Sequence, residues 1–207
     1  MKKCVVIGGG VVGLCSAYYL AKAGHQVIVV DSSDMSKGCS YSNAGMIVPS
    51  HVIPLAQPGM ISKGIRWMTN SKSPFYVKPR LDRDLFSWGL SFYKNSTQAH
   101  VLKSMPILRD LSVLSKELFQ DLQRESKSFL YDEKGLLMLY RTEKTGKSEI
   151  LAGEAAEELG LGVDFLNKEE INKVEQGLKT NAIGGVLYKS DAHLSPVLFM
   201  TFLKDQL

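Results

Sequence analysis

The stretch MKKCVVIGGGVVGLCSAYYLAKAGHQVIVVD, residues 1–31, decides the fold. Two lysines ahead of an apolar run are typical of an export signal, whereas closely spaced glycines are typical of a nucleotide-binding turn. A signal peptide needs an uninterrupted apolar segment followed by a cleavage site of small residues. Here glycines interrupt the run, and Tyr18, Tyr19 and Lys22 follow it. The stretch therefore favours a folded domain.

The residue pattern of this stretch predicts a βαβ unit. The β-branched run at 3–7 predicts a strand, and the glycines at 8–13 predict a turn. Residues 12–23 have the composition of a helix, and residues 26–30 form a second β-branched run that ends at Asp31.

The turn carries a G-x-G-x-x-G pattern. Gly8 permits the tight turn, Gly10 lets a pyrophosphate approach the backbone, and Gly13 brings the helix close to the strand. The pattern is weak in isolation, but here it follows a strand and opens a helix. We expect Gly8, Gly10, Val11, Val12 and Gly13 to bind a dinucleotide.

Asp31 is the candidate ligand of the adenosine ribose. Its carboxylate would accept hydrogen bonds from the ribose hydroxyls and would disfavour a 2′-phosphate, so NADP is the least favoured dinucleotide. A solvated strand end or a helix cap is the alternative. The βαβ unit alone does not separate NAD from FAD. The segment after Asp31 is rich in Ser, Gly and Pro where an NAD domain would continue with another helix and strand, so it predicts a cofactor-covering loop and favours FAD.

Four segments together resemble a known family: residues 7–31, SYSNAG at 40–45, IVPSHVIPLAQPG at 47–59 and KGIRWM at 63–68. The chain resembles the FAD-dependent D-amino-acid dehydrogenases, within the wider group of glycine oxidase, sarcosine oxidase and D-amino-acid oxidase. The resemblance implies a Rossmann-like FAD-binding βαβ domain with an inserted α+β substrate domain, an α/β fold that is incomplete at the C-terminus.

The resemblance also implies site residues. Small residues let backbone amides approach a planar ring, and the segment that runs beside the flavin in the family corresponds here to Ser40, Asn43, Ala44, Gly45 and Met46. Ser50 and His51 follow this segment and are candidates to approach the flavin or the substrate, although lone polar residues in such a loop also serve as surface or capping groups. We expect no metal site.

The implied domain division places residues 1–80 in the FAD-binding domain, 81–190 in the substrate domain and 191–207 in a return helix of the FAD-binding domain. Further elements expected from the sequence are helices at 81–93, 106–124 and 142–159, strands at 134–141, 162–166 and 182–188, and a last helix from Pro196 with Ser195 as its cap. In the helix at 106–124, an apolar stripe predicts core packing: Ile107, Leu111, Leu114, Leu118 and Leu122.

The implied reaction is oxidation of a D-amino acid to an imino acid by hydride transfer from Cα to flavin N5, followed by hydrolysis to a 2-oxo acid and ammonia. No obligatory acid–base side chain is expected. The electron acceptor is open among a quinone, a dye and oxygen. The alternatives are an amine oxidase of the glycine, sarcosine or hydroxyproline type, and a noncatalytic dinucleotide-binding subunit of a split enzyme.

The family continues beyond the length of this chain, so we expect an N-terminal fragment or one piece of a split enzyme, inactive without a C-terminal half or partner chain. That half would carry the arginine for the substrate carboxylate. The formal charge of +4 is dispersed along the chain, which disfavours a nucleic-acid partner. Three cysteines without paired spacing favour a reducing compartment, so we expect a cytoplasmic protein of amino-acid catabolism, with peripheral association with the inner membrane as a further expectation.

Overall fold

A computed structural model describes residues 1–36, 38–68, 82–177 and 180–207. The N-terminal stretch forms the predicted βαβ unit, with β1 at Lys3–Ile7, α1 at Val11–Lys22 and β2 at Gln26–Val30. The two strands are parallel and pair in register from Lys3 with Gln26 to Ile7 with Val30. Because parallel neighbours need a crossover, α1 packs against both strands and closes the unit.

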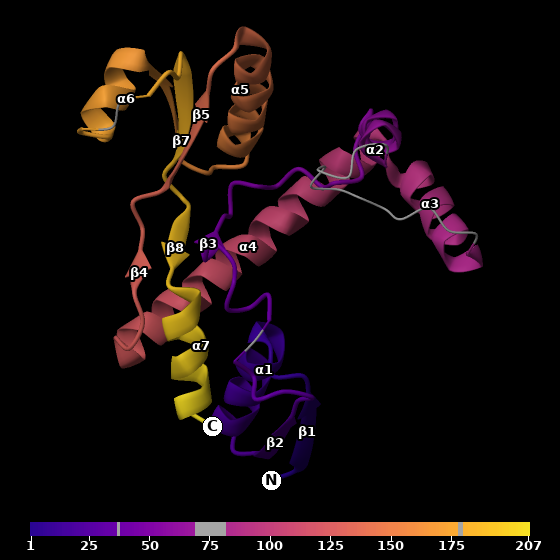
Figure 1. Cartoon of the computed structure of the whole chain (residues 1–207), viewed down its shortest axis with the longest axis vertical. Helices are drawn as coiled ribbons and strands as arrows, with labels where there is room; N and C mark the ends of the chain where they lie inside the picture. Colours follow the sequence, from indigo (N-terminus) through magenta and orange to yellow (C-terminus); the bar gives the residue numbers. More distant parts are fainter. Residues whose placement is uncertain (37, 69–81, 178–179) are drawn as a thin grey trace.

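A second, antiparallel sheet of very short strands occupies the centre of the molecule (Figure 1). Its order is β3 (Met46–Ile47), β8 (Ala192–Leu194) and β4 (Tyr131–Asp132). These strands come from distant parts of the sequence, and they are too short to show a two-residue alternation. The sequence analysis therefore missed all three strands. The chain leaves β8 directly into α7 at Pro196–Asp205, which packs on α1.

A third sheet forms the opposite lobe of the molecule (Figure 1). Its strands are antiparallel in the order β5-β7-β6, and its central strand β7 is mostly buried. Helix α5 packs on the sheet, and α6 extends from the end of β6. The bounds of these elements are β5 Leu136–Tyr140, α5 Glu143–Glu158, β6 Val163–Asn167, α6 Lys168–Val174 and β7 Gly184–Tyr188.

Helix ends in this part of the chain follow local side-chain chemistry. Thr142 caps α5 by accepting a hydrogen bond from the Thr145 N–H. Asn167 and Glu170 form a reciprocal capping box at the start of α6, and Ser195 caps α7 with Pro196 at its first position. The predicted Ser195 cap is confirmed.

The segment after Asp31 and the helix that follows it differ from the prediction. The segment after Asp31 is not only a loop, because it contains β3 and α2 (Met60–Met68). Helix α3 spans Arg83–Asn95, and its predicted first residue, Leu81, lies outside the described residues.

Among the described residues, no helix is both long enough and apolar enough to cross a membrane.

Helix α4 (Gln98–Ser126) begins well before the predicted position at Pro106. Proline is favoured in the first turn of a helix, and that preference led to the wrong start. The helix instead begins after Thr97, whose side chain accepts a hydrogen bond from the His100 N–H. The first turns then contribute Val101 and Met105 to the core, and this packing offsets the backbone hydrogen bond that Pro106 removes.

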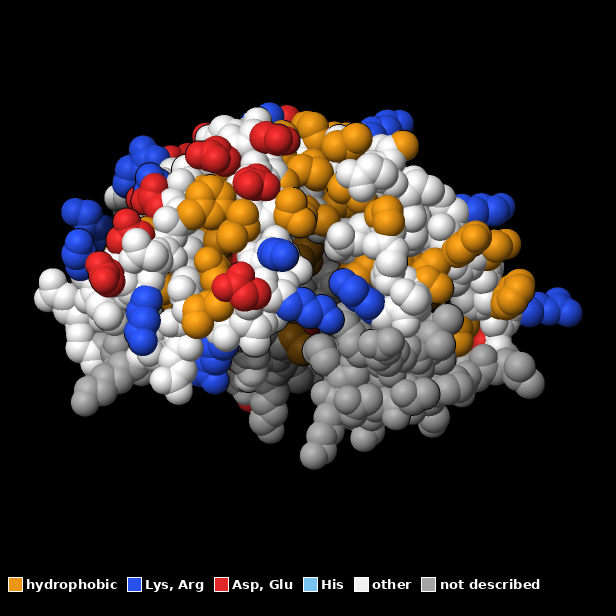
Figure 2. Space-filling model, turned by 90° about the horizontal axis from the view of Figure 1, so that it is seen from above, with side chains coloured by type: hydrophobic (Ala, Val, Ile, Leu, Met, Phe, Trp, Pro, Cys, Tyr) orange, Lys and Arg blue, Asp and Glu red, His pale blue; other side chains and the backbone are white. Residues whose placement is uncertain are grey.

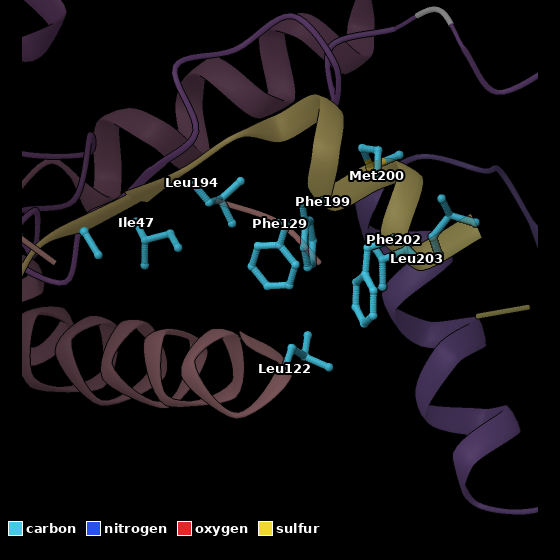
Figure 3. Close-up of a cluster of buried hydrophobic side chains, with 10 residues drawn as sticks. Ile47, Leu122, Phe129, Leu194, Phe199, Met200, Phe202 and Leu203 are labelled. Carbon is cyan, nitrogen blue, oxygen red and sulfur yellow. The ribbon is translucent and has the colours of Figure 1, made fainter. Parts of the chain in front are cut away.

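One hydrophobic core joins α7, α1 and the C-terminal end of α4. The ring of Phe129 lies 4.9 Å from that of Phe199 and 5.4 Å from that of Phe202, measured between centroids. Figure 3 shows these rings beside one another, with Leu122 of α4 beneath them. Aromatic contacts of this kind, edge-to-face for Phe129 with Phe199 and tilted for Phe129 with Phe202, stabilise the return of the chain onto the βαβ unit.

A second core lies beneath the sheet of the opposite lobe. It includes Val186 of β7, Ala156 of α5 and Val101 of α4. Val52, from the loop after β3, is buried in the same cluster. The loop that leaves the central sheet is thereby anchored to the opposite lobe.

The apolar stripe of α4 is mostly exposed, so the prediction of core packing is wrong for four of its five residues: Ile107, Leu111, Leu114 and Leu118. Leu111 keeps 60% of its surface exposed, whereas Leu122 keeps 3%. Leu111, Leu114 and Leu118 instead line open hollows beside the core that α1 and α7 share, so much of their surface stays exposed. In Figure 2, on the face seen from above, apolar side chains also reach the surface among interspersed acidic and basic groups.

Candidate functional site

The glycine turn between β1 and α1 depends on close backbone contacts. Gly8 has φ +103°, in the left-handed region, and its N–H donates to the Val30 carbonyl at 2.7 Å. A Cβ on Gly13 would lie 1.9 Å from the Gly8 carbonyl oxygen. Both positions therefore require glycine for the turn itself, before any ligand is considered.

The N-terminus of α1 has no side-chain cap, because Gly10 is the N-cap residue. A Cβ on Gly10 would meet the Ser40 Oγ at 3.3 Å. That Oγ accepts a hydrogen bond from the Val11 N–H at 3.0 Å, and it thereby holds the segment after β2 against the helix start. Backbone N–H groups and the helix dipole at such an end favour an anion.

The segment from Ser40 to Gly45 is a closed turn. The Asn43 amide donates to the carbonyls of Cys39 and Ser40, and its Oδ1 accepts from the Gly45 N–H at 2.8 Å. Gly45 has φ +64°, and a Cβ there would lie 2.0 Å from the Leu194 carbonyl oxygen. The turn is therefore fixed to β8.

Asp31 lies beside the glycine turn, at the end of β2. Its Oδ2 accepts from the Gly9 N–H at 2.7 Å, and its Oδ1 accepts from the N–H and the hydroxyl of Ser33. The Gly9 hydrogen bond is the largest cause that lowers the pKa of Asp31, followed by the bonds from Ser33. The carboxylate closes a local turn and caps no helix of the described residues, and it also gives an ionised acceptor next to the helix start.

A cavity of about 350 Å³ opens between the glycine turn, the middle of α4 and the start of α7. This volume is in the range of small-molecule sites. Of the predicted cofactor residues, five line it: Val11, Ser40, Asn43, Gly45 and Met46. Six others form or flank the turns behind the lining: Gly8, Gly10, Val12, Gly13, Asp31 and Ala44.

The residues present fit a dinucleotide. The start of α1, where the N-cap residue Gly10 has no side chain, offers backbone donors beyond the Val11 N–H to a diphosphate, and Asp31 offers an acceptor to a ribose. Apolar side chains on the far wall of the cavity, including Phe119 and Phe199, suit a planar ring.

Ser50 and His51 do not line this cavity, whose wall reaches Val48. They form a hydrogen-bonded cluster with Asp191, a residue that the sequence analysis missed. Ser50 donates to Asp191 twice, from its N–H at 3.0 Å and from its hydroxyl at 2.6 Å. The Ser50 Oγ also lies 3.0 Å from the His51 Nδ1.

The Asp191 carboxylate is fully buried, with 0% of its surface exposed, and Ser50 is 4% exposed. Burial raises the pKa of Asp191, and the two hydrogen bonds from Ser50 oppose this rise. An aspartate just before a three-residue strand gave no sequence signal of burial, because the strand itself was not recognised.

A profile described as FAD dependent oxidoreductase, DAO, matches residues 3–207. A D-amino acid dehydrogenase of Helicobacter pylori is 30% identical over 206 residues, which cover 100% of this chain and 49% of the relative. A D-amino acid dehydrogenase of Phenylobacterium zucineum is 32% identical, with 98% of this chain and 49% of the relative covered. This chain spans about half the length of these curated relatives.

Among solved structures, the glycine oxidase of Bacillus cereus superposes with a TM-score of 0.61. The superposition covers 99% of this chain and 43% of that protein, at 18% sequence identity. At that identity the likeness establishes the fold, which is the α/β, Rossmann-like fold expected from the sequence.

Proposed function

The chain belongs to the DAO family of FAD-dependent oxidoreductases, and we propose that it forms the N-terminal half of an enzyme that oxidises a D-amino acid. The products would be an imino acid and, after hydrolysis, a 2-oxo acid and ammonia. The relatives that it matches over its whole length support this substrate class, since they are named D-amino acid dehydrogenases.

The cavity beside the glycine turn and the start of α1 is the observation that carries the proposal. FAD bound there would supply the chemistry by accepting a hydride from the substrate Cα. In this chain, N–H groups around Gly10 and Val12 would hold the diphosphate, and Asp31 would accept from the ribose. The residues proposed to border the flavin are Ser40, Asn43, Ala44, Gly45 and Met46.

The proposed domain division follows from this placement of the cofactor. Residues 1–80 and 191–207 would bind the cofactor, and residues 81–190 would contribute to the substrate lobe. The hydrophobic core between α1 and α7 supports this grouping of the two chain ends. A substrate would then lie between the lobes, where ligand sites are common.

We propose that a C-terminal half or a partner chain covers two apolar surfaces. One is the outer face of the parallel sheet, where Val5, Ile7, Ile28 and Val30 are exposed. The other is the part of the α4 stripe outside the cofactor cavity, at Ile107, Leu114 and Leu118. Contiguous apolar surfaces of this kind mark interfaces. The arginine that pairs with the substrate carboxylate would come from the covering half, so these residues alone would be inactive.

The test uses the intact protein that contains this chain, purified with its flavin. Under anaerobic conditions, D-amino acids should bleach the visible flavin absorption, and their L-enantiomers should not. Bleaching by glycine, sarcosine or hydroxyproline in place of D-amino acids would support the amine-oxidase alternative. Bleaching only after a second polypeptide is added would support the split-enzyme alternative.

The same reduced sample tests the electron acceptor. Reoxidation is compared after addition of oxygen, a quinone or a dye, and the fastest acceptor defines dehydrogenase or oxidase behaviour. Cell fractionation tests the proposed cytoplasmic location and the proposed peripheral association with the inner membrane.

A further inference from the structure

The cluster of Asp191, Ser50 and His51 contains a buried carboxylate that is held by one serine. In the described part of the chain, no lysine or arginine forms an ion pair with Asp191. Its oxygens accept from Ser50 at 2.6 and 3.0 Å, with the Ser190 hydroxyl farther away at 3.4 Å. A buried carboxylate without a cationic partner is costly, so its retention points to a role beyond packing.

The geometry fixes the order of donors along the cluster. An ionised carboxylate only accepts, so the Ser50 hydroxyl donates its proton to Asp191. The Ser50 Oγ is then an acceptor toward the His51 Nδ1, 3.0 Å away. The His51 Nδ1 must therefore carry the hydrogen, and the lone pair of a neutral imidazole lies on Nε2.

The cluster lies at the junction of the two lobes. Ile47 of β3 pairs with Ala192 of β8, so Ser50 and Asp191 meet just beyond the end of this ladder. Val48, two residues before Ser50, is part of the cavity wall. Val52, the residue after His51, is buried in the core of the opposite lobe. The backbone on both sides of His51 is thus anchored, while the His51 side chain is exposed.

Among the residues that the structure describes, two titratable groups have recorded contacts or links to His51. Asp191 is linked to it through Ser50, and the ring of Tyr188 lies 5.9 Å from the imidazole. Burial, followed by the nearby charges of Glu149 and Asp191, raises the pKa of Tyr188 to about 12, so this phenol stays neutral across the physiological range.

We propose that Asp191 and Ser50 are positioning residues that hold His51 in its Nδ1–H tautomer, and that the His51 Nε2 accepts a proton from the substrate ammonium group. This inference rests on the proposed oxidation of an amino acid. An N–H bond of the ammonium group breaks, and an Nε2–H bond forms. The electron pair left on nitrogen is the pair that formation of the imine requires. The imidazolium then returns its proton to water.

This role differs from what the family resemblance implied, since no obligatory acid–base side chain was expected. The two are compatible because a substrate amine that is already neutral needs no acceptor. His51 would matter at neutral pH, where amino groups of amino acids are protonated, and its contribution would vanish in alkaline solution.

The first test is His51→Gln in the intact, FAD-loaded protein. Flavin reduction by a D-amino acid at pH 7 should slow about 100-fold, which is typical for loss of a general base. The deficit should shrink steadily as the pH approaches the pKa of the substrate amine. The matched control is His100→Gln on α4, whose imidazole contacts Ser104 one helical turn away, and its rate should match that of the wild type.

The second test does not depend on activity. Nitrogen-15 NMR of the imidazoles should show the Nδ1–H tautomer for His51 in the wild type. In Asp191→Asn, the new amide group donates to the Ser50 Oγ, so the Ser50 hydroxyl turns toward the His51 Nδ1 and the Nε2–H tautomer should appear. Ser50→Ala, which removes the linking hydroxyl, serves in the same measurement if Asp191→Asn does not retain its flavin.

The outcomes separate the two proposals. If D-amino acids reduce the wild type and His51→Gln equally fast at pH 7, the proposed function stands and the role of His51 is wrong. An unchanged tautomer in both Asp191→Asn and Ser50→Ala would overturn the positioning role. If no D-amino acid reduces the wild-type flavin, the proposed function fails, and the proton-acceptor role fails with it.

Discussion

Asp31 and Asp191 accept hydrogen bonds from similar donors but lie in different surroundings. Asp31 accepts a backbone N–H from Gly9 and the N–H and hydroxyl of Ser33, at the partly exposed edge of the glycine turn. Asp191 accepts the N–H and hydroxyl of Ser50 in the buried junction between the lobes. The pKa of Asp31 is lowered by its hydrogen bonds, whereas the pKa of Asp191 is raised by burial.

The difference shows that the surrounding solvent, more than the donor set, decides what a carboxylate can do. At the edge of the turn, water stabilises the charge, so a ligand hydroxyl can exchange with water around Asp31 at little cost. In the junction, nothing replaces the donors of Ser50, so Asp191 can fix the orientation of a neighbouring side chain. The first carboxylate suits ligand binding, and the second suits positioning.

The largest expected effects on stability come from Gly45 and Gly13, because each packs directly against a backbone carbonyl group. Gly45→Ala should destabilise the protein by about 3–5 kcal/mol, because its Cβ would overlap the Leu194 carbonyl and its left-handed φ adds a further cost. Gly13→Ala should cost somewhat less, since only the overlap with the Gly8 carbonyl operates. Denaturation midpoints of the intact protein measure both changes.

Gly24→Ala is the matched control for these two variants. Gly24 has φ +82°, but a Cβ there would meet no atom within 4 Å. Its cost should be only about 1 kcal/mol, from the backbone conformation alone. Equal midpoints for Gly24→Ala and Gly45→Ala would show that the junction yields to the added methyl group.

The next effect compares the two carboxylates directly. Asp191→Ala should destabilise the protein by about 2–4 kcal/mol, because it leaves the buried N–H and hydroxyl of Ser50 without an acceptor. Asp31→Ala should have a smaller effect on the melting temperature, because the N–H and hydroxyl of the exposed Ser33 regain water and only the N–H of Gly9 loses a buried acceptor. Similar losses in both variants would contradict the distinction between the two regions.

A smaller effect should appear in cofactor affinity. Asp31→Asn should weaken FAD binding about tenfold, because an ionised acceptor becomes an amide with half the acceptor capacity. Titration of FAD into the apoprotein measures the change. Asp34→Asn is the control, since Asp34 is a nearby exposed carboxylate that caps its own turn through Ser36. Equal affinities for all three proteins would leave Asp31 as a turn cap only.

The smallest effect is the pH dependence of stability, which should have opposite signs at the two sites. Asp31 has a lowered pKa in the folded state, so its contribution is present above the unfolded value of 3.8 and is lost as the pH falls below it. Asp191 has a raised pKa, so stability falls as the pH rises from 3.8 through the raised value.

Melting temperatures of the wild type, Asp31→Asn and Asp191→Asn between pH 3 and pH 7 test these signs. The wild type should lose its advantage over Asp31→Asn on the acid side. Relative to Asp191→Asn, the wild type should gain stability as the pH falls from neutral toward 4. If both differences in melting temperature changed with pH in the same direction, the contrast between Asp31 and Asp191 would be contradicted.

Local patterns were sufficient for the βαβ unit and for the cap at Ser195. In each case the partners lie within a few residues, or within one strand–helix–strand unit, so the sequence carries the whole interaction. The glycine spacing likewise identified the turn, because a missing Cβ at Gly13 is a local requirement. The family resemblance added the fold class and the cofactor.

Long-range packing decided the rest. The start of α4 was misplaced because the burial of Val101 and Met105 outweighs the local preference of Pro106. The exposed stripe of α4 was read as core because periodicity shows that a face is apolar, and does not show what covers it.

The sequence by itself determined the nucleotide-binding unit, because hydrogen bonding and sterics within a short segment fix it. Only the tertiary structure joined Ser50 to Asp191, since the two meet through a ladder of β3 and β8 that is too short to show a period. The tertiary structure also decided that Asp31 stays partly exposed to water whereas Asp191 is buried. The pKa values of these two aspartates therefore shift in opposite directions although their hydrogen-bond donors are similar. Burial is a property of the whole packed chain, which is why no local pattern contained it.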